Sequence, residues 1–218
     1  MTTGRILCIP HGGGPLPIMG EPSHDEIVAF LRATEARIGR PKAIVVVSAH
    51  WECDVPTLTS GATPPLIYDY FGFPPETYEL QYPAPGSPGL AERTAELLTG
   101  AGFEPALDDN RGFDHGMFIP LLLMYPDAQI PVIQISMLAS LDPAAHIAMG
   151  AALAPLAAED VLVLGSGLSF HNMNAFGPAN PASGIDEDNE AFDAWLADTC
   201  TSAEYTERER ADRLANWE

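Results

Sequence analysis

The sequence has no apolar run of about 18 residues, the length that a membrane-spanning helix requires. Its N-terminus, MTTGRILCIPHGGG, lacks the basic segment, the long apolar segment and the cleavage site of a secretory signal. These absences argue against membrane insertion and against secretion. We therefore expect a cytoplasmic protein.

Basic residues are also scarce. The chain has 10 Lys and Arg against 30 Asp and Glu, which gives a formal net charge of −20. Such a field repels phosphate backbones and anionic lipid surfaces, so we expect neither a nucleic acid nor a membrane as a partner. It also disfavours anionic small molecules, and a carboxylated substrate would need a local cation such as Arg111.

Cysteine occurs only at positions 8, 53 and 200, with no C-x-x-C pair. An odd number of distant cysteines fits neither a disulfide framework nor a thiolate zinc site. We expect three free thiols.

What the sequence does contain is the pattern of an α/β protein. At 218 residues and 46% hydrophobic content, it has the size and composition of one domain with its own core. Helical patterns with apolar residues three and four apart alternate with short β-branched runs of the kind that form buried strands. We predict a single domain with a largely parallel central sheet flanked by helices. The expected strands are 6–10, 43–49, 131–137 and 161–167, and the expected helices are 24–39, 87–102 and 142–159.

Residues 63–86 contain six prolines and six aromatic residues without a sustained period. This composition predicts a long ordered loop with short strand pieces. Such a loop either packs its own aromatic residues over the sheet or forms the wall of a pocket for a flat substrate, to which Tyr70 would contribute. From residue 185 the chain turns acidic and helical, which is typical of a solvated helical face.

Four of the six histidines follow an apolar run or a glycine-rich turn. Ligands bind at the carboxyl ends of parallel strands, and neutral imidazole is a common metal ligand. We therefore predict one metal site formed by His11, His50, His115 and His171. His24 and His146 lie in helical contexts, and we interpret them as structural. Polar neighbours that either fix an imidazole tautomer or cap a turn are Ser48, Asp114, Ser166 and Asn172.

Of two other motif interpretations, a serine hydrolase fails and a dinucleotide-binding turn is weak. The HGGG sequence at 11–14 is similar to the oxyanion loop of lipase-like esterases, but LGSGLS at 164–169 is not the G-x-S-x-G nucleophile elbow that such enzymes need. The stretch 165–170, GSGLSF, lacks the third glycine of a dinucleotide-binding turn, because Phe170 stands there.

Five motifs in the same order resemble the class III extradiol dioxygenases, and most of all the branch that contains the bacterial and plant 4,5-DOPA extradiol dioxygenases. They are PHGGGPLPI, SAHWE, YDYFGFPPETYELQYPAPG, RGFDHGMFIPL and GSGLSFHN, between residues 10 and 172. The resemblance implies a mononuclear non-haem iron(II) site, or a zinc site, with His11 and His50 as ligands. It places His171 at the metal or beside it, as a ligand or as an acid/base. It places His115 in the substrate pocket, where that residue assists proton transfer or holds the substrate. We add Arg111 and Tyr70 as expected substrate contacts.

The activity that the resemblance implies is insertion of both atoms of O2 into a catechol-type aromatic substrate, with ring opening. A catechol must lose protons to chelate a metal, and a neutral histidine can accept one. Iron(II) suits this oxidation, whereas zinc has no redox chemistry. The alternative is a zinc-binding hydrolase or a non-catalytic metal-binding protein of the same fold. A homodimer is compatible with either.

Members of this family continue past an NWE-like segment into a stretch whose late histidine or glutamate completes the metal site. This sequence stops at Glu218, and no histidine follows His171. We therefore expect residues 1–218 to be a single catalytic domain that lacks the C-terminal segment, with an under-coordinated metal.

Overall fold

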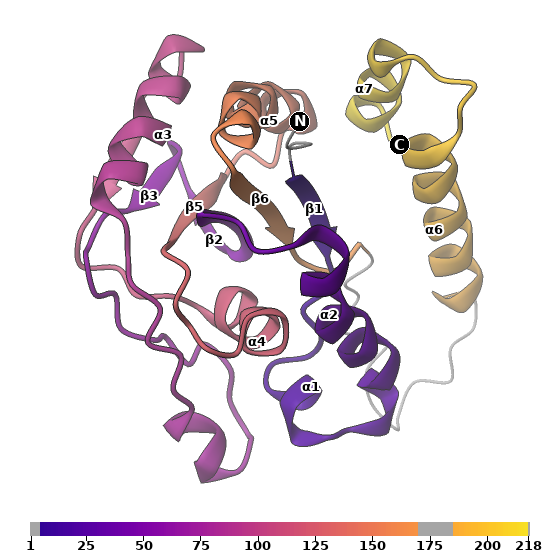
Figure 1. The fold of residues 1–218 in the computed structure, drawn as a ribbon. Coiled ribbons are helices and arrows are strands. Elements are labelled where there is room, and N and C mark those ends of the chain that lie inside the picture. The colour runs from indigo at the N-terminus through magenta and orange to yellow at the C-terminus, as the bar shows by residue number, and fades with distance from the viewer. Residues whose placement is uncertain (1–4, 170–184, 218) are drawn as a thin grey trace.

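The structure is a computed structural model that describes residues 5–169 and 185–217. Its centre is a six-stranded sheet with the strand order β1-β6-β2-β5-β3-β4 (Figure 1). Four neighbouring strands, β1, β6, β2 and β5, are mutually parallel. Strand β3 is antiparallel to β5, and β4 is parallel to β3. The strands are β1 (Arg5–Ile9), β2 (Ala43–Cys53), β3 (Thr57–Thr59), β4 (Ala106–Asp108), β5 (Val132–Leu138) and β6 (Val161–Ser166).

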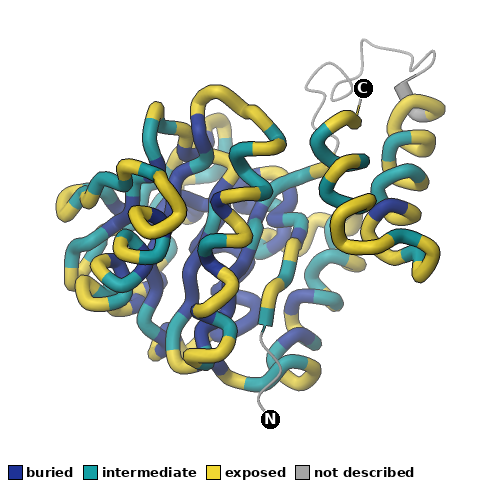
Figure 2. The backbone as a smooth tube through the Cα atoms, turned by 90° about the horizontal axis from the view of Figure 1, so that it is seen from above, coloured by how far each residue is buried: buried dark blue, intermediate teal, exposed yellow. Residues whose placement is uncertain are grey.

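Helices cover both faces of this sheet. Successive residues of β2 point to opposite faces: Ile44 and Val46 join a core under α2 and α4, and Val45 joins a second core under α3 and α5. Figure 2 shows the resulting buried interior inside an exposed shell. The α-helices are α1 (Leu16–Met19), α2 (Asp25–Ile38), α3 (Pro88–Gly100), α4 (His115–Met124), α5 (Pro143–Ala158), α6 (Ile185–Thr201) and α7 (Glu207–Ala215), and the 3-10 helices are η1 (Pro22–His24) and η2 (Pro75–Glu79).

The predicted single-domain α/β fold is confirmed. Each of the four predicted strands and three predicted helices has its counterpart, namely β1, β2, β5 and β6 and α2, α3 and α5. Helix α4 was not predicted, because nine of its ten residues are buried and it therefore has no polar stripe. The three-residue strands β3 and β4 are too short to show a pattern.

The aromatic stretch 63–86 is the ordered loop that its composition predicted. Parallel bridges tie Leu66 to Phe113 and Gly86 to Val132, and the 3-10 helix η2 lies between them. The Tyr82 hydroxyl is buried and donates a hydrogen bond to the backbone carbonyl of Tyr125. The loop is therefore fastened to α4 and to the sheet.

The acidic region is helical, as predicted, and the side chains described on α6 and α7 are mostly exposed. Helix α7 begins with a capping box between Thr206 and Glu209, and it packs against α5. Among the helices within residues 5–169 and 185–217, none has the length and apolarity to cross a membrane. The three cysteines are free thiols, as expected.

Candidate metal centre

His11 leaves the carboxyl end of β1 on a tight glycine turn. Gly12 has a φ of +77°, and a Cβ there would lie 2.6 Å from the Pro17 side chain, so glycine is required. The next amide, that of Gly13, donates a hydrogen bond to Nε2 of His24 over 3.1 Å. His24 thus supports the turn, in agreement with its predicted structural role.

His50 lies within β2 rather than after its end, which corrects the predicted strand boundary. The pairing of β2 with β5 changes register between Val47 and Glu52, and His50 is in this irregular part. Its amide donates to the Ser48 hydroxyl over 3.2 Å. Such irregularities in a strand redirect side chains, here toward the carboxyl edge of the sheet.

His115 is the first residue of α4, so it begins a helix, where the sequence pattern indicated only a turn before an apolar run. The loop residue Asp69 receives two hydrogen bonds from it. Both the amide and the Nδ1–H of His115 donate to Oδ1 of Asp69, over 3.0 and 2.8 Å.

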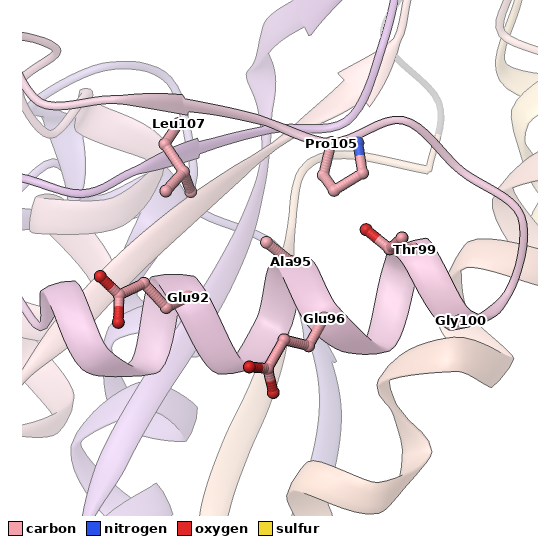
Figure 3. A pocket seen from close by; sticks show the side chains of 7 residues that line it. All are labelled: Glu92, Ala95, Glu96, Thr99, Gly100, Pro105 and Leu107. Atoms are coloured by element: carbon pink, nitrogen blue, oxygen red, sulfur yellow. The ribbon is translucent and has the colours of Figure 1, made fainter.

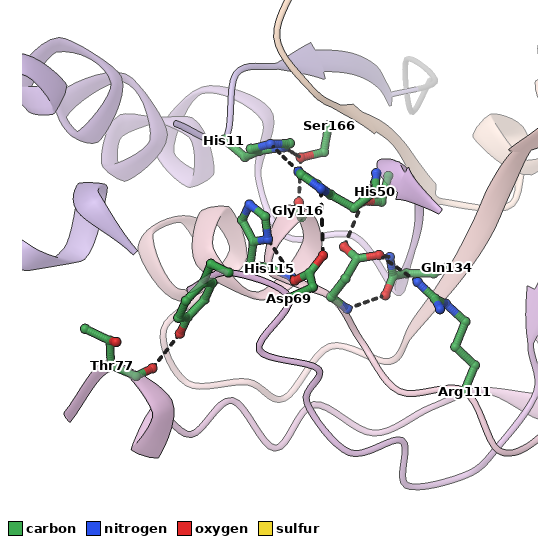
Figure 4. A network of polar contacts seen from close by, with 12 residues as sticks. His11, His50, Asp69, Thr77, Arg111, His115, Gly116, Gln134 and Ser166 are labelled. Carbon is green, nitrogen blue, oxygen red and sulfur yellow. Dashed lines mark hydrogen bonds and ion pairs between the residues drawn. The ribbon is translucent and has the colours of Figure 1, made fainter. Parts of the chain in front are cut away.

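These three elements bring His11, His50 and His115 together (Figure 4). Their ring centroids lie 4.1–5.2 Å apart, and one nitrogen from each falls within a group no wider than 4.8 Å. The Nε2 atoms of His11 and His50 are 3.0 Å apart. Two metal–nitrogen bonds of about 2.0–2.1 Å at angles between 90° and tetrahedral separate their nitrogens by about 2.8–3.4 Å. This geometry fits an ion shared by His11 and His50. The fourth predicted histidine, His171, lies outside the described residues.

The protonation state of the His11 ring is also compatible with metal binding through Nε2. The Ser166 hydroxyl donates its one hydrogen to the carbonyl of Gly116, so its oxygen accepts a hydrogen bond from Nδ1–H of His11 over 3.0 Å. Nε2 of His11 is then the nitrogen with a lone pair, and it faces Nε2 of His50. Ser166 therefore fixes the tautomer of His11, whereas the sequence had suggested it only as a neighbour of His171.

The sequence did not indicate that Asp69 is part of the site. Burial opposes ionisation of its carboxyl, but the hydrogen bonds from the side chain and amide of His115 outweigh that effect and hold the pKa of Asp69 below its ordinary value. Its second oxygen lies 3.7 Å from Nδ1 of His50. Asp69 is 46 residues from His115 in sequence, and its one signal was its place inside a long ordered loop.

Asp114, the sequence neighbour of His115, has another task. It is fully buried and accepts hydrogen bonds from Ser48 of β2 over 2.7 Å and from Gln134 of β5 over 2.8 Å. It also pairs with Arg111 over 3.2 Å. Asp114 therefore joins the start of α4 to the sheet, while Asp69 contacts the His115 ring.

Of the two predicted substrate contacts, Arg111 belongs to the Asp114 network and Tyr70 lies next to His115. The guanidinium of Arg111 stacks 4.1 Å from the ring centroid of Trp51, the residue that follows His50. The Tyr70 ring lies 5.7 Å from that of His115, and its hydroxyl donates to the carbonyl of Thr77. Burial raises the pKa of Tyr70 to about 12, so this wall of the cluster is a neutral phenol.

A hollow without histidines lies between α3 and the edge strand β4 (Figure 3). Its lining combines Glu92 and Glu96 with small or apolar groups such as Ala95, Pro105 and Leu107. It offers two carboxylates of the same sign and no imidazole, so the histidine cluster is the better candidate for chemistry.

Replacing Ser166 tests the support of His11. Ser166→Ala removes the acceptor for Nδ1–H, so we expect metal affinity to fall by about 10–100-fold, the usual cost of losing an outer partner. Metal titration of the purified variant measures this, with the exposed Ser169→Ala as the matched control. Unchanged affinity would mean that Ser166 does not orient the imidazole.

Gly116 sits where any larger residue would collide with the site. A Cβ there would lie 2.5 Å from Oγ of Ser48 and 3.3 Å from Nδ1 of His11. We expect Gly116→Ala to lower the free energy of unfolding by about 1–3 kcal/mol, as overpacking does, and to weaken metal binding.

Urea unfolding and metal titration check both effects. The control is Gly150→Ala in α5, where a Cβ meets nothing within 4 Å; this change is expected to stabilise the protein by about 0.5–1 kcal/mol. Equal effects of the two substitutions would contradict the crowding at Gly116.

The chain is similar to known proteins over most of its length. Residues 5–215 match the family LigB, described as the catalytic LigB subunit of aromatic ring-opening dioxygenase. The dioxygenase tasH of Hapsidospora irregularis is 46% identical over 184 residues, which are 80% of this chain and 57% of that protein. The 4,5-DOPA dioxygenase extradiol of Beta vulgaris is 42% identical over 213 residues, 96% of this chain and 78% of that protein.

The protein of the same name from Escherichia coli is 48% identical over 135 residues, 62% of this chain and 49% of its own length. This chain thus spans only about half to four-fifths of these relatives. A crystal structure of an uncharacterized protein from Escherichia coli K12 superposes with a TM-score of 0.63 at 32% identity, covering 87% of this chain and 80% of that one. Since the family match extends over nearly the whole chain, the protein belongs to the LigB family of aromatic ring-opening dioxygenase catalytic subunits.

Proposed function

We propose that the protein is an extradiol dioxygenase that opens the ring of a catechol-type substrate with O2 at a mononuclear metal site. The observation that carries this proposal is the 3.0 Å approach of the two Nε2 atoms of His11 and His50, next to a third imidazole held by Asp69. The names of the Beta vulgaris and Escherichia coli relatives support the same reaction class.

In this proposal His11 and His50 hold the metal, and the metal is iron(II). Bound iron(II) supplies open positions for a catecholate and O2 and the redox chemistry that zinc lacks. His171 stays predicted at the metal or beside it, and incomplete coordination within residues 1–218 stays a prediction.

His115 acts as the base toward the substrate. Its Nδ1–H is directed at Asp69, so Nε2 keeps its lone pair and can accept a proton from a catechol hydroxyl. The open side of the cluster lies at His50 and Asp69, whose side chains are 29% and 23% exposed. A substrate entering there would meet the Tyr70 ring as a wall.

In this proposal Arg111 contacts an anionic group of the substrate. Its side chain is 21% exposed, and its pairing with Asp114 and stacking on Trp51 hold it in a fixed orientation. The proposal therefore favours catechols that carry a carboxylate.

The second candidate is a zinc hydrolase or a zinc-binding protein without catalysis. One observation favours it: three imidazoles within 4.8 Å are also a ligand set of catalytic zinc sites, where zinc activates a water molecule. The two candidates differ in the metal that supports activity and in whether O2 is consumed.

The test is anaerobic reconstitution with iron(II), followed by a panel of catechols with O2 uptake as the readout. Zinc-loaded protein, assayed for O2 uptake and for ester hydrolysis, is the matched control. Uptake with iron alone supports the dioxygenase. Hydrolysis by the zinc form without uptake by the iron form would favour the second candidate.

A further inference from the structure

The loop residue Asp69 contacts His115 and lies near His50. We propose that Asp69 is a positioning residue, which selects the Nδ1–H tautomer of His115 and accepts the His115 amide at the start of α4. The consequence for turnover rests on the proposed function, because it requires His115 to act as a base. The effect on the tautomer does not.

Two hydrogen bonds to one oxygen fix the imidazole. The amide and the Nδ1–H of His115 both donate to Oδ1 of Asp69, over 3.0 and 2.8 Å, so backbone and ring are held by the same atom. The tautomer of a histidine is set by the hydrogen bond that its other nitrogen makes. With Nδ1 committed to a carboxylate, Nε2 carries the lone pair and faces the cluster.

Asp69 also replaces a helix cap. The N-cap residue of α4, Asp114, makes no side-chain cap hydrogen bond, because its carboxylate is used by Ser48, Gln134 and Arg111. The amide of His115 at the first position of the helix is satisfied by Asp69 instead. A carboxylate at this end of a helix is also favoured by the helix dipole.

The same carboxylate also lies near the imidazole of His50. Oδ2 lies 3.7 Å from Nδ1 of His50, while Nε2 of His50 faces His11. One acidic group thus lies near one ring nitrogen of His50 and one of His115.

The loop does not depend on Asp69 for its fold. The amide of Ile67 donates to the carbonyl of Phe113, and the amide of Phe113 donates to the carbonyl of Pro65, each over 2.8 Å. Within the loop, the Tyr70 hydroxyl donates a hydrogen bond to the backbone carbonyl of Thr77. Variants at position 69 are therefore expected to fold, with the change confined to His115.

The experiment is NMR of the metal-free full chain labelled with ¹⁵N-histidine, which reports the tautomer of each ring directly. His115→Gln assigns the His115 signals. We expect Nδ1–H in the native protein, loss of that tautomer in Asp69→Ala, and its retention in Asp69→Asn, which keeps one oxygen acceptor. Asp54→Asn, at an exposed position outside the network, is the matched control.

In iron-loaded protein, Asp69→Ala is expected to lower kcat by about 10–100-fold at an unchanged KM, with partial rescue in Asp69→Asn. An Nε2–H tautomer for His115 in the native protein, or the same tautomer in native and Asp69→Ala protein, would overturn the proposal. If the tautomer responds as expected and no catechol is consumed, the positioning role stands and the proposed function fails.

Discussion

The variants His11→Ala and His50→Ala are expected to lose the metal and all measurable turnover. Each removes one of the two nitrogens that face each other across 3.0 Å, so a shared ion loses a direct bond. Metal affinity should fall by more than the about 10–100-fold loss that removal of a supporting residue causes. Metal analysis after gel filtration and O2 uptake with a catechol measure the two losses.

His146→Gln is the matched control. Nε2 of His146 accepts a hydrogen bond from the amide of Leu138, and its Nδ1 contacts the carbonyl of Asp142, so it has the structural role that the sequence indicated. This variant is expected to keep metal and turnover even where its stability falls. One equivalent of metal bound by His11→Ala or His50→Ala with native affinity would refute the assignment of these two ligands.

His115→Ala is expected to behave differently, with metal largely kept and turnover reduced by about 10²–10⁴-fold, the usual contribution of a general acid or base. The imidazole is 4% exposed and is held by Asp69 at the edge of the cluster. Metal content and kcat measured on the same sample separate the two effects.

Two results would contradict this role. Near-native turnover in His115→Ala would remove His115 from the chemistry. Loss of the metal together with turnover would instead make His115 the third ligand, in line with the three-imidazole group that the geometry allows.

The sequence predicted the fold well wherever a pattern had room to repeat. The 14 residues of α2 carry a helical period, and the seven of β5 lie in a β-branched apolar run. Helix α4 was missed because a helix that is apolar on all sides has no period, although it carries His115. The interruption in β2 at His50 depends on pairing with β5, which no local pattern records.

The candidate site was predicted in part. The sequence led to His11, His50 and His115, which the structure brings together: His11 follows β1 and His50 lies late in β2, at the shared carboxyl edge of parallel strands, while His115 comes from the start of α4. Their partners were less visible. Ser166 was noticed as a neighbour of His171 but contacts His11, and Asp69 and Gln134 approach only through the tertiary fold.

The most direct test of the central claim is the stoichiometry of one turnover by iron(II)-loaded protein with a catechol that supports uptake. A ring-opening dioxygenase consumes one O2 for each catechol, releases no hydrogen peroxide, and gives a product with the mass of the substrate plus one O2 molecule. We predict all three. Peroxide formation with a quinone product, or no O2 consumption by protein that has bound iron, would contradict the proposed extradiol activity.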